Sequence, residues 1–176
     1  MRRLFLVLAA GLAVAGCSET PHVVPQPAPP RPVPAPTPVP SPTPTLGADW
    51  RDWPLTPGNW VYRQDGRGSI ALYGRAGAEA ELTLRCDSAR GRVIVSRRGA
   101  GPATLTVRTS SNLRQLAVQP VAGATPWLAA ELAPRDSLLD AMGFSRGRFV
   151  VEATGLPTLV VPAYAEVLRI AEDCRG

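Results

Sequence analysis

EAELTLRC, residues 79–86, is the stretch that decides the fold, because apolar and polar side chains alternate along it. The apolar face holds Leu82, Leu84 and Cys86, and the polar face holds Glu81, Thr83 and Arg85. Successive side chains of a strand point to opposite sides of a sheet, so this period of two predicts a strand with one dry face and one wet face. Sheets with one solvated face are typically antiparallel.

Similar short runs, separated by turn signals, lie on both sides of this stretch. They predict strands at residues 60–62, 69–73, 93–96, 104–108, 116–118, 148–153 and 158–161. Asp65-Gly66-Arg67-Gly68 and Gly155-Leu156-Pro157 are rich in turn residues, so each is expected to close a hairpin between its flanking strands.

Two helices are predicted in the last third of the chain. Residues 137–142 form a short one, with Asp136 able to cap its start and Gly143 able to end it. A second helix follows Pro162 and turns a stripe toward the core, made of Tyr164, Val167, Leu168, Ala171 and Cys174. The predicted fold is therefore mainly β with minor α: an antiparallel β sandwich or small barrel with a short helix and a packed C-terminal helix.

The composition excludes several classes of protein. The chain has 176 residues, with 19 basic residues that are all Arg, 14 acidic residues and 20 Pro. Without Lys, a Walker-type phosphate loop and Schiff-base chemistry are excluded. The length favours one compact domain. The net charge of +5 falls to +3 without residues 1–16, since 17 Arg then face 14 acids, and this argues against a dedicated nucleic-acid binder.

The first 17 residues have the pattern of a secretory signal. Arg2 and Arg3 precede 13 apolar or small residues, 4–16, which are fewer than the about 20 that span a membrane as a helix. Val14-Ala15-Gly16-Cys17 resembles the lipobox of bacterial lipoproteins. The resemblance implies cleavage before Cys17, a lipid on its thiol and an acyl chain on its new N-terminus. Ser18, where lipoproteins kept at the inner membrane typically carry Asp, favours the outer membrane. An ordinary signal peptide with an incidental Cys is the alternative.

A Pro-rich segment follows, with 12 Pro in residues 21–45. Pro lacks an N–H group and has a fixed φ, so the segment is expected to be an extended polyproline II stalk of roughly 75–80 Å. A docking segment for a groove that binds polyproline II is the alternative. His22, the only His, lies here and is expected to be solvated. The expected organisation is a signal peptide (1–16), a lipidated Cys with a Pro-rich stalk (17–46) and a β-rich periplasmic domain (47–176).

Cys86 and Cys174 are the two cysteines that remain once Cys17 carries lipid. Both fall on the apolar faces of their predicted elements. In an oxidising compartment two inward-facing thiols are expected to form a disulfide, and two separate buried thiols are the alternative.

Catalytic patterns are present but incomplete. Gly143-Phe144-Ser145-Arg146-Gly147 matches the G-x-S-x-G of a hydrolase, yet residues 47–176 contain no His or Lys to act as a base. The predicted helix also precedes it and the strand follows, the reverse of the hydrolase order, so a turn is the better interpretation. No cluster has metal-ligand spacing, and no cofactor is predicted.

Three further groups of residues have a functional and a structural interpretation. Glu79 and Glu81 would share one face of a strand, at a spacing suited to a glycosidase, although an exposed solvated face is favoured. Four arginines, Arg90, Arg92, Arg97 and Arg98, form either a basic patch or an ordinary solvent-facing group. Trp50 and Trp53 either bind a glycan or partner, or lock the N-terminal segment onto a sheet.

The span 82–175 resembles small two-cysteine secreted β domains, namely periplasmic proteins associated with type VI secretion and the invasion-associated locus B type. The resemblance rests on Leu84-Arg85-Cys86, on the hairpin of residues 148–161 and on a final helix ending in Cys174. It covers about half of the chain. It implies the disulfide and the architecture, and it carries over no functional residue.

These observations predict a non-enzymatic outer-membrane lipoprotein that binds or supports an envelope partner. The membrane is a partner through lipidated Cys17, and a protein or the cell wall is the second. An inhibitor of a cell-wall hydrolase or protease is the alternative, with Pro120–Pro126 or Ser110–Asn112 as its protruding loop. A glycan hydrolase that uses Glu79 and Glu81 in a cleft is a remote alternative.

Overall fold

The computed structural model describes residues 46–101 and 104–176, so Cys17 and the Pro-rich segment lie outside it. Within these ranges a short 3-10 helix, η1 (Trp50–Asp52), precedes ten strands and two α-helices. The strands are β1 (Asn59–Asp65), β2 (Gly68–Gly74), β3 (Leu82–Asp87), β4 (Arg92–Arg98), β5 (Thr104–Arg108), β6 (Leu113–Ala117), β7 (Gln119–Val121), β8 (Trp127–Leu132), β9 (Arg148–Glu152) and β10 (Leu159–Pro162). The helices are α1 (Ser137–Gly143) and α2 (Ala165–Arg175).

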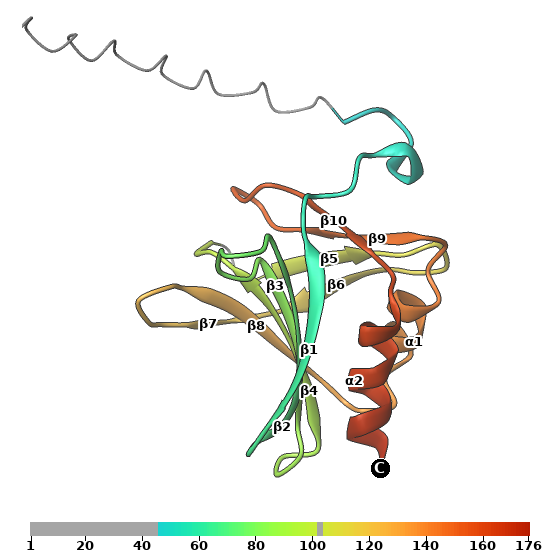
Figure 1. Ribbon diagram of the computed structural model, residues 1–176. Coiled ribbons are helices and arrows are strands. Elements are labelled where there is room, and N and C mark those ends of the chain that lie inside the picture. The colour runs from blue at the N-terminus through green and yellow to red at the C-terminus, as the bar shows by residue number, and fades with distance from the viewer. Residues whose placement is uncertain (1–45, 102–103) are drawn as a thin grey trace, which may run out of the picture. The chain divides into compact units, whose positions relative to one another are not determined.

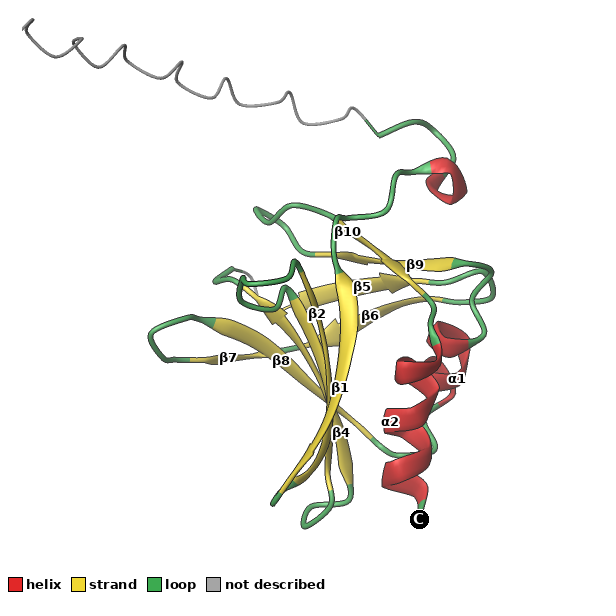
Figure 2. Ribbon diagram, viewed as in Figure 1, coloured by secondary structure: helices red, strands yellow, loops and turns green. Residues whose placement is uncertain are grey.

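The strands form two antiparallel sheets. The larger sheet has the order β1-β2-β3-β4-β8-β7, and the smaller has the order β10-β9-β5-β6. The two sheets meet at an angle, and α2 runs along the larger one (Figures 1 and 2). The predicted class, mainly β with a C-terminal helix packed on a sheet, is confirmed.

The β1–β2 hairpin closes through a two-residue turn. Asp65 pairs with Gly68, and Gly66-Arg67 connect them. Gly68 has φ +132°, and a Cβ atom there would lie 2.4 Å from the carbonyl oxygen of Cys86. The turn therefore requires glycine at this position.

The apolar faces of both sheets enclose one core. The larger sheet contributes side chains such as Tyr73, Leu84 and Val95, and the smaller contributes Leu105 and Phe149; all five are fully buried. Each large apolar side chain removed from water stabilises the fold by about 1.5–3 kcal/mol. The apolar residues of the alternating pattern are therefore the ones that face the core, on one face of each sheet.

The chain before β1 connects the two sheets. The backbone N–H of Thr56 donates to the carbonyl of Val160 on β10 (2.9 Å), and the Thr56 hydroxyl accepts from the N–H of Val160 (2.9 Å). The indole N–H of Trp60 donates to the carbonyl of Pro162 (2.9 Å). These bonds hold the start of β1 against β10 of the smaller sheet.

Helix α2 differs from its prediction in the stripe that it buries. Val167, Ile170 and Ala171 are fully buried, whereas Tyr164 is 52% exposed. Tyr164 was wrongly placed in the stripe because it precedes the helix and adopts extended backbone angles, so helical spacing does not apply to it. Leu168 packs toward α1, where a Cβ on Gly143 would lie 2.3 Å from it.

Several strand bounds also differ. Strand β3 begins at Leu82 rather than at Glu79, and the predicted strand 116–118 spans the boundary between β6 and β7. Strand β8 had no counterpart in the prediction, because Ala129 and Ala130 hide its alternation. Among the described residues, no helix is both long enough and apolar enough to cross a bilayer.

Candidate functional site

A disulfide joins the larger sheet to α2. The sulfur atoms of Cys86 and Cys174 lie 2.24 Å apart and their Cα atoms 5.3 Å apart. The predicted bond is therefore present. It holds the last turn of α2 against β3, the third strand from the edge of the sheet.

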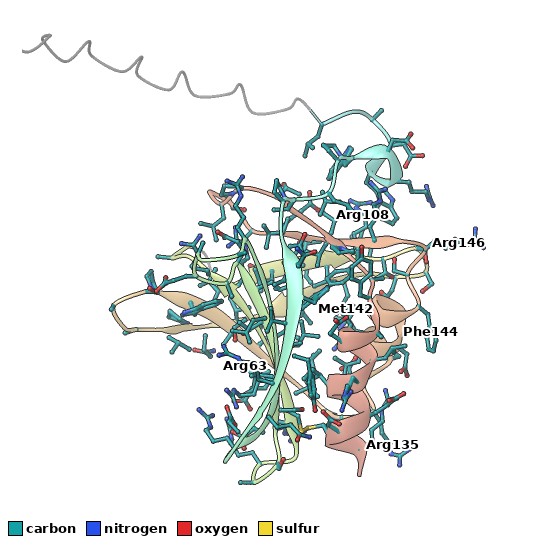
Figure 3. All side chains as sticks on the ribbon, viewed as in Figure 1. Arg63, Arg108, Arg135, Met142, Phe144 and Arg146 are labelled. Atoms are coloured by element: carbon teal, nitrogen blue, oxygen red, sulfur yellow. A yellow bond between two sulfur atoms is a disulfide. The ribbon has the colours of Figure 1, made fainter. Side chains whose placement is uncertain are left out.

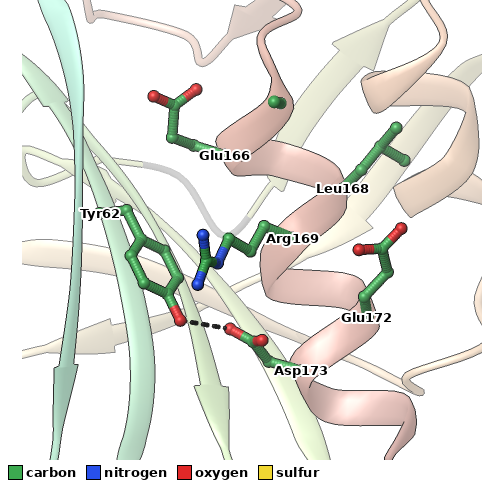
Figure 4. Close-up of a pocket in the computed structure, with 7 residues that line it drawn as sticks. Tyr62, Glu166, Leu168, Arg169, Glu172 and Asp173 are labelled. Carbon is green, nitrogen blue, oxygen red and sulfur yellow. Dashed lines mark hydrogen bonds between the residues drawn. The ribbon is translucent and has the colours of Figure 1, made fainter.

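A groove lies between β1 and the helix that the disulfide holds. Because α2 buries one stripe, its polar side chains border the sheet and solvent, and Tyr62 of β1 faces them (Figure 4). The hollow between them has a volume of about 640 Å³. We call it the β1–α2 groove, and it is lined by Tyr62, Ala165, Glu166, Leu168, Arg169, Glu172 and Asp173.

The side chains of Tyr62, Arg169 and Asp173 form the floor of the groove. The phenol of Tyr62 donates a hydrogen bond to Asp173 Oδ2 (2.8 Å), and the guanidinium of Arg169 lies 4.3 Å from the centre of the Tyr62 ring. Figure 4 shows the three pointing toward one another, whereas Glu172 points to the other side of the helix. A cation over an aromatic face is attracted by the ring quadrupole.

The groove is acidic. Its lining holds three carboxylates, those of Glu166, Glu172 and Asp173, and one guanidinium, that of Arg169. None of these four groups forms an ion pair with another residue in the described part of the chain. An unneutralised set of charges on a concave surface concentrates potential, here negative.

A second hollow adjoins the groove at Asp173. It has a volume of about 350 Å³ and is lined by Gln64, Ser69, Ser88 and Asp173 among others. Asp173 borders both hollows, so they are neighbours.

Ser145, the centre of the G-x-S-x-G pattern, has a structural role. It is 5% exposed, accepts a hydrogen bond from the N–H of Ser110 (3.0 Å) and donates one to the carbonyl of Arg148. These bonds tie the turn before β9 to the turn before β6. The predicted turn is found, between α1 and β9.

Glu79 and Glu81 do not share one face of a strand, and that prediction is wrong because β3 begins after them. Both line a hollow of about 290 Å³. Glu79 accepts a hydrogen bond from the Thr125 hydroxyl (2.7 Å). Both carboxylate oxygens of Glu81 are bound by guanidinium groups, Oε2 by Arg97 at 2.9 Å and Oε1 by Arg98. A carboxylate engaged in this way is a poor general base, because transferring a proton to it breaks two ion pairs.

The four arginines around β4 do not form a common basic patch. Arg97 is 3% exposed, so the expectation that it faces solvent is wrong. Burial lowers the pKa of Arg97, and the charge of Glu81 opposes this effect. Arg97 also donates to the carbonyl of Pro157 (3.2 Å) between β9 and β10, so it links the two sheets. Arg90 pairs with Glu131 at 2.7 Å.

A further hollow, of about 760 Å³, lies at the turns that follow β1 and β3, and its charges are paired. Arg85 Nη2 lies 2.7 Å from Asp65 Oδ2, and Arg67 Nη2 lies 3.1 Å from Asp87 Oδ2. The hydrogen bond from Arg85 is the main reason that the pKa of Asp65 falls to about 2. This hollow therefore offers a ligand fewer free charges than the β1–α2 groove does.

The predicted loops and tryptophans lie elsewhere on the surface. Residues 120–126 lie at the end of the β7–β8 hairpin, which projects from the body in Figure 1, and Val121 there is 50% exposed. The turn of residues 110–112 is tied to Ser145. Two hydrogen bonds hold Trp53. Its indole N–H donates to the carbonyl of Gly47 (2.6 Å), and its backbone carbonyl accepts from the guanidinium of Arg148.

One apolar side chain stands out on the surface. Phe144, within the G-x-S-x-G turn, is 72% exposed. Figure 3 shows it and Arg146 directed away from the body, whereas Met142 points inward. We assign no site to this single side chain.

Sequence reasoning did not identify the β1–α2 groove. The signal available was the polar side of the last helix, where Glu166, Arg169 and Asp173 recur at helical spacing. That spacing does not tell which strand lies beside the helix.

No group of residues within 46–101 and 104–176 has the arrangement of a metal site. Comparison with protein-family models, with curated proteins and with solved structures gives no significant match.

Proposed function

We propose that the protein is a lipid-anchored envelope protein whose folded domain binds another envelope component in the β1–α2 groove. The anchor is Cys17 and the location is the outer membrane facing the periplasm, as the lipobox-like segment and Ser18 suggest. The Pro-rich segment serves as a spacer between lipid and domain.

The observation that carries this proposal is the set of charged side chains in the groove that have no ion-pair partner. Other acidic groups of the described residues form ion pairs within the domain, as Asp65 does with Arg85 and Glu81 with Arg97. In the groove, Glu166 and Asp173 line a hollow together with Arg169 and form no ion pair within the domain. Such a site suits binding, because a partner supplies the opposite charge with little rearrangement of the domain.

A non-enzymatic role is favoured by the side chains themselves. The groove holds no nucleophile paired with a base, and Ser145, Glu79 and Glu81 are each engaged in hydrogen bonds or ion pairs within the domain. We therefore assign binding rather than catalysis to the domain, with no cofactor.

Crosslinking in intact cells tests the proposal. A photoreactive residue is placed at Gln64, which lines the hollow adjoining the groove, or at Arg63, its neighbour on the opposite face of β1. We expect position 64 to give a discrete crosslinked product that position 63 does not give, with mass spectrometry identifying the partner. Equal products from both positions, or none from position 64, would contradict the proposal.

A second function is favoured by the β7–β8 hairpin. Its tip, residues 120–126, projects from the domain and carries the exposed Val121 (Figure 1). An inhibitor of a cell-wall hydrolase or protease needs such a protruding loop. Replacing residues 122–125 by Gly and Ser would abolish inhibition of a periplasmic hydrolase, whereas it would leave crosslinking from position 64 intact.

A further inference from the structure

We propose that the β1–α2 groove binds an extended basic peptide, which adds to the free edge of β1 as a seventh strand of the larger sheet. The inference rests on the proposed binding function and specifies its ligand. Strand addition of this kind uses backbone hydrogen bonds for affinity and side-chain contacts for specificity.

The first step is the free edge. Strand β1 pairs with β2 alone in the described structure. The carbonyl of Tyr73 accepts from the N–H of Glu81 (2.7 Å), so the backbone of Tyr73 points away from β1. In an antiparallel ladder the bonded and non-bonded pairs alternate, and Tyr73 is opposite Trp60. Hence Trp60, Tyr62 and Gln64 direct their backbone N–H and C=O groups away from β2.

The open part of this edge is short. The indole of Trp60 is bonded to the carbonyl of Pro162, so that end of β1 lies next to the chain that leads into α2. Tyr62 and Gln64 remain, with two donors and two acceptors. Proteins commonly protect such an edge with Pro, Lys or a bulge. Between Trp60 and Asp65 the strand has none of these, and its pairing with β2 is regular.

The second step is the fit beside the helix. Glu166 and Asp173 lie seven residues apart on α2, which is about 10 Å at 1.5 Å per residue. Three residues of a strand cover the same length at about 3.4 Å each. A strand of four residues added to β1 would therefore lie beside the stretch of α2 from Glu166 to Asp173. Its alternate side chains would point toward the helix.

The third step is the charge of the occupant. The flank of α2 that faces Tyr62 carries Glu166 and Asp173 without ion-pair partners, and the guanidinium of Arg169 is held over the Tyr62 ring. Same-face residues of the added strand lie about 6.8 Å apart, and the long, flexible side chains of Arg or Lys at these positions would reach the two carboxylates. The ligand is therefore a polypeptide segment with a basic residue at every second position.

Two other occupants fit less well. A second copy of this chain, paired through its own β1, would bring the two acidic helix flanks together, and like charges in such a junction are unfavourable. The Pro-rich segment of residues 21–45 has only one basic residue, Arg31, and its many Pro lack the N–H groups that a ladder needs. Charge and backbone chemistry thus favour a separate basic strand.

The experiment measures peptide binding to the full lipidated protein in nanodiscs. The probe is a fluorescent seven-residue peptide with Arg at the second, fourth and sixth positions and Thr or Val elsewhere. We expect it to bind at least tenfold more tightly than the same peptide with Glu in place of Arg. Equal binding of the two, or binding of neither, would overturn the proposal.

Backbone methylation separates strand addition from simple charge attraction. N-methyl groups are placed on alternate residues in one phase or in the other, and only one phase removes the donors that face β1. We expect one phase to lose at least tenfold in affinity and the other to stay within threefold. If both phases keep their affinity, the edge is not used and the proposal is wrong.

Variants of the protein locate the site. Glu166→Gln with Asp173→Asn removes both charges while keeping the size of the side chains, and we expect at least a tenfold loss. The matched control, Asp52→Asn with Glu79→Gln, removes the same charge outside the groove and should stay within threefold. Gln64→Pro removes a single outward-facing N–H and should also weaken binding; if it does not fold, the methylated peptides decide.

The experiments distinguish a failure of the strand-addition mechanism from a failure of the proposed binding function. A partner crosslinked at position 64, together with no preference for the Arg peptide, leaves the binding function standing and removes the strand mechanism. Concentration-dependent dimerisation that Gln64→Pro abolishes would show that a second copy occupies the edge, and it would also overturn the inference.

Discussion

Removal of the Cys86–Cys174 disulfide should cost the domain a large part of its stability. The two cysteines are 88 residues apart in the sequence. In the chain-entropy relation a loop of that length removes about 15 cal/mol/K from the unfolded chain, which is about 4–5 kcal/mol at 25 °C. Small domains have a total free energy of unfolding of about 5–15 kcal/mol, so the bond supplies a substantial fraction of it.

The assay is urea unfolding of a chain that begins at Ser18, compared with the same chain carrying Cys86→Ala and Cys174→Ala. With an m-value of about 2 kcal/mol/M, a loss of 4 kcal/mol lowers the unfolding midpoint by about 2 M. Reduction of the unchanged chain is the control, because it breaks the bond and keeps both sulfur atoms in place. It should lower the midpoint by a similar amount.

The location of the effect is also predicted. Val167, Ile170 and Ala171 keep α2 on the sheet by apolar burial, whereas the turn around Cys174 depends more on the bond. We expect trypsin to cleave after Arg169 in the variant before it cleaves elsewhere in the domain. A midpoint shift below 0.5 M, or α2 as well protected as in the oxidised chain, would refute this reasoning.

Four further predictions concern other residues. Cys17→Ser should leave the protein without lipid and move it from the membrane to the soluble fraction; fractionation and mass spectrometry check this, and a wild type that lacks lipid would contradict it. Ser145→Ala should lower the free energy of unfolding by about 1–3 kcal/mol, because two buried backbone groups lose their partner, and should remove no activity; a hydrolase activity lost in the folded variant would overturn the structural assignment. Asp65 has a pKa near 2, below the ordinary 3.8, so its contribution to stability is complete above about pH 4 and is lost as the pH falls toward 2; Asp65→Asn should flatten the urea midpoint between pH 5 and pH 2, while an unchanged pH profile would show that the bond to Arg85 contributes nothing. Arg97→Met should destabilise the domain by about 3 kcal/mol or more, since a buried ion pair loses one member, and thermal unfolding measures it; a variant as stable as the wild type would refute the role of this residue in linking the sheets.

The fold was predictable because the alternation of side chains is strong. Leu82, Leu84 and Cys86 occupy the buried face of β3 that their spacing predicts, and the disulfide follows from Cys86 and Cys174 both facing the core. Local pattern determines these features, since each depends on which face of an element is apolar.

Other features depend on contacts distant in sequence. Arg97 has the composition of a surface residue, and only the arrival of Glu81 and Pro157 allows it to be buried. Tyr164 matches a helical spacing, but the helix begins after it. In both cases the local pattern is compatible with two structures, and the tertiary contact selects one.

The groove is the clearest example of this limit. Its residues come from β1 and α2, about 100 positions apart in the sequence, and each is unremarkable alone. Whether Tyr62 lies on an edge strand depends on the order of strands in the sheet, which alternation does not encode. The polar side of α2 was visible in the sequence, and its neighbour was not.

The disulfide and the groove are physically linked. The bond attaches the turn of α2 that contains Asp173 to β3, while the edge that would receive a ligand is β1, two strands away. With the bond intact, Asp173 and the β1 edge are held in place before a ligand arrives, so binding does not have to order them, and a lower ordering cost gives a higher affinity. In the reduced chain the last turn of α2 would fray, and the hydrogen bond from Tyr62 to Asp173 would be lost with it. A basic peptide should therefore bind the oxidised protein more tightly than the reduced one, even under conditions in which both remain folded.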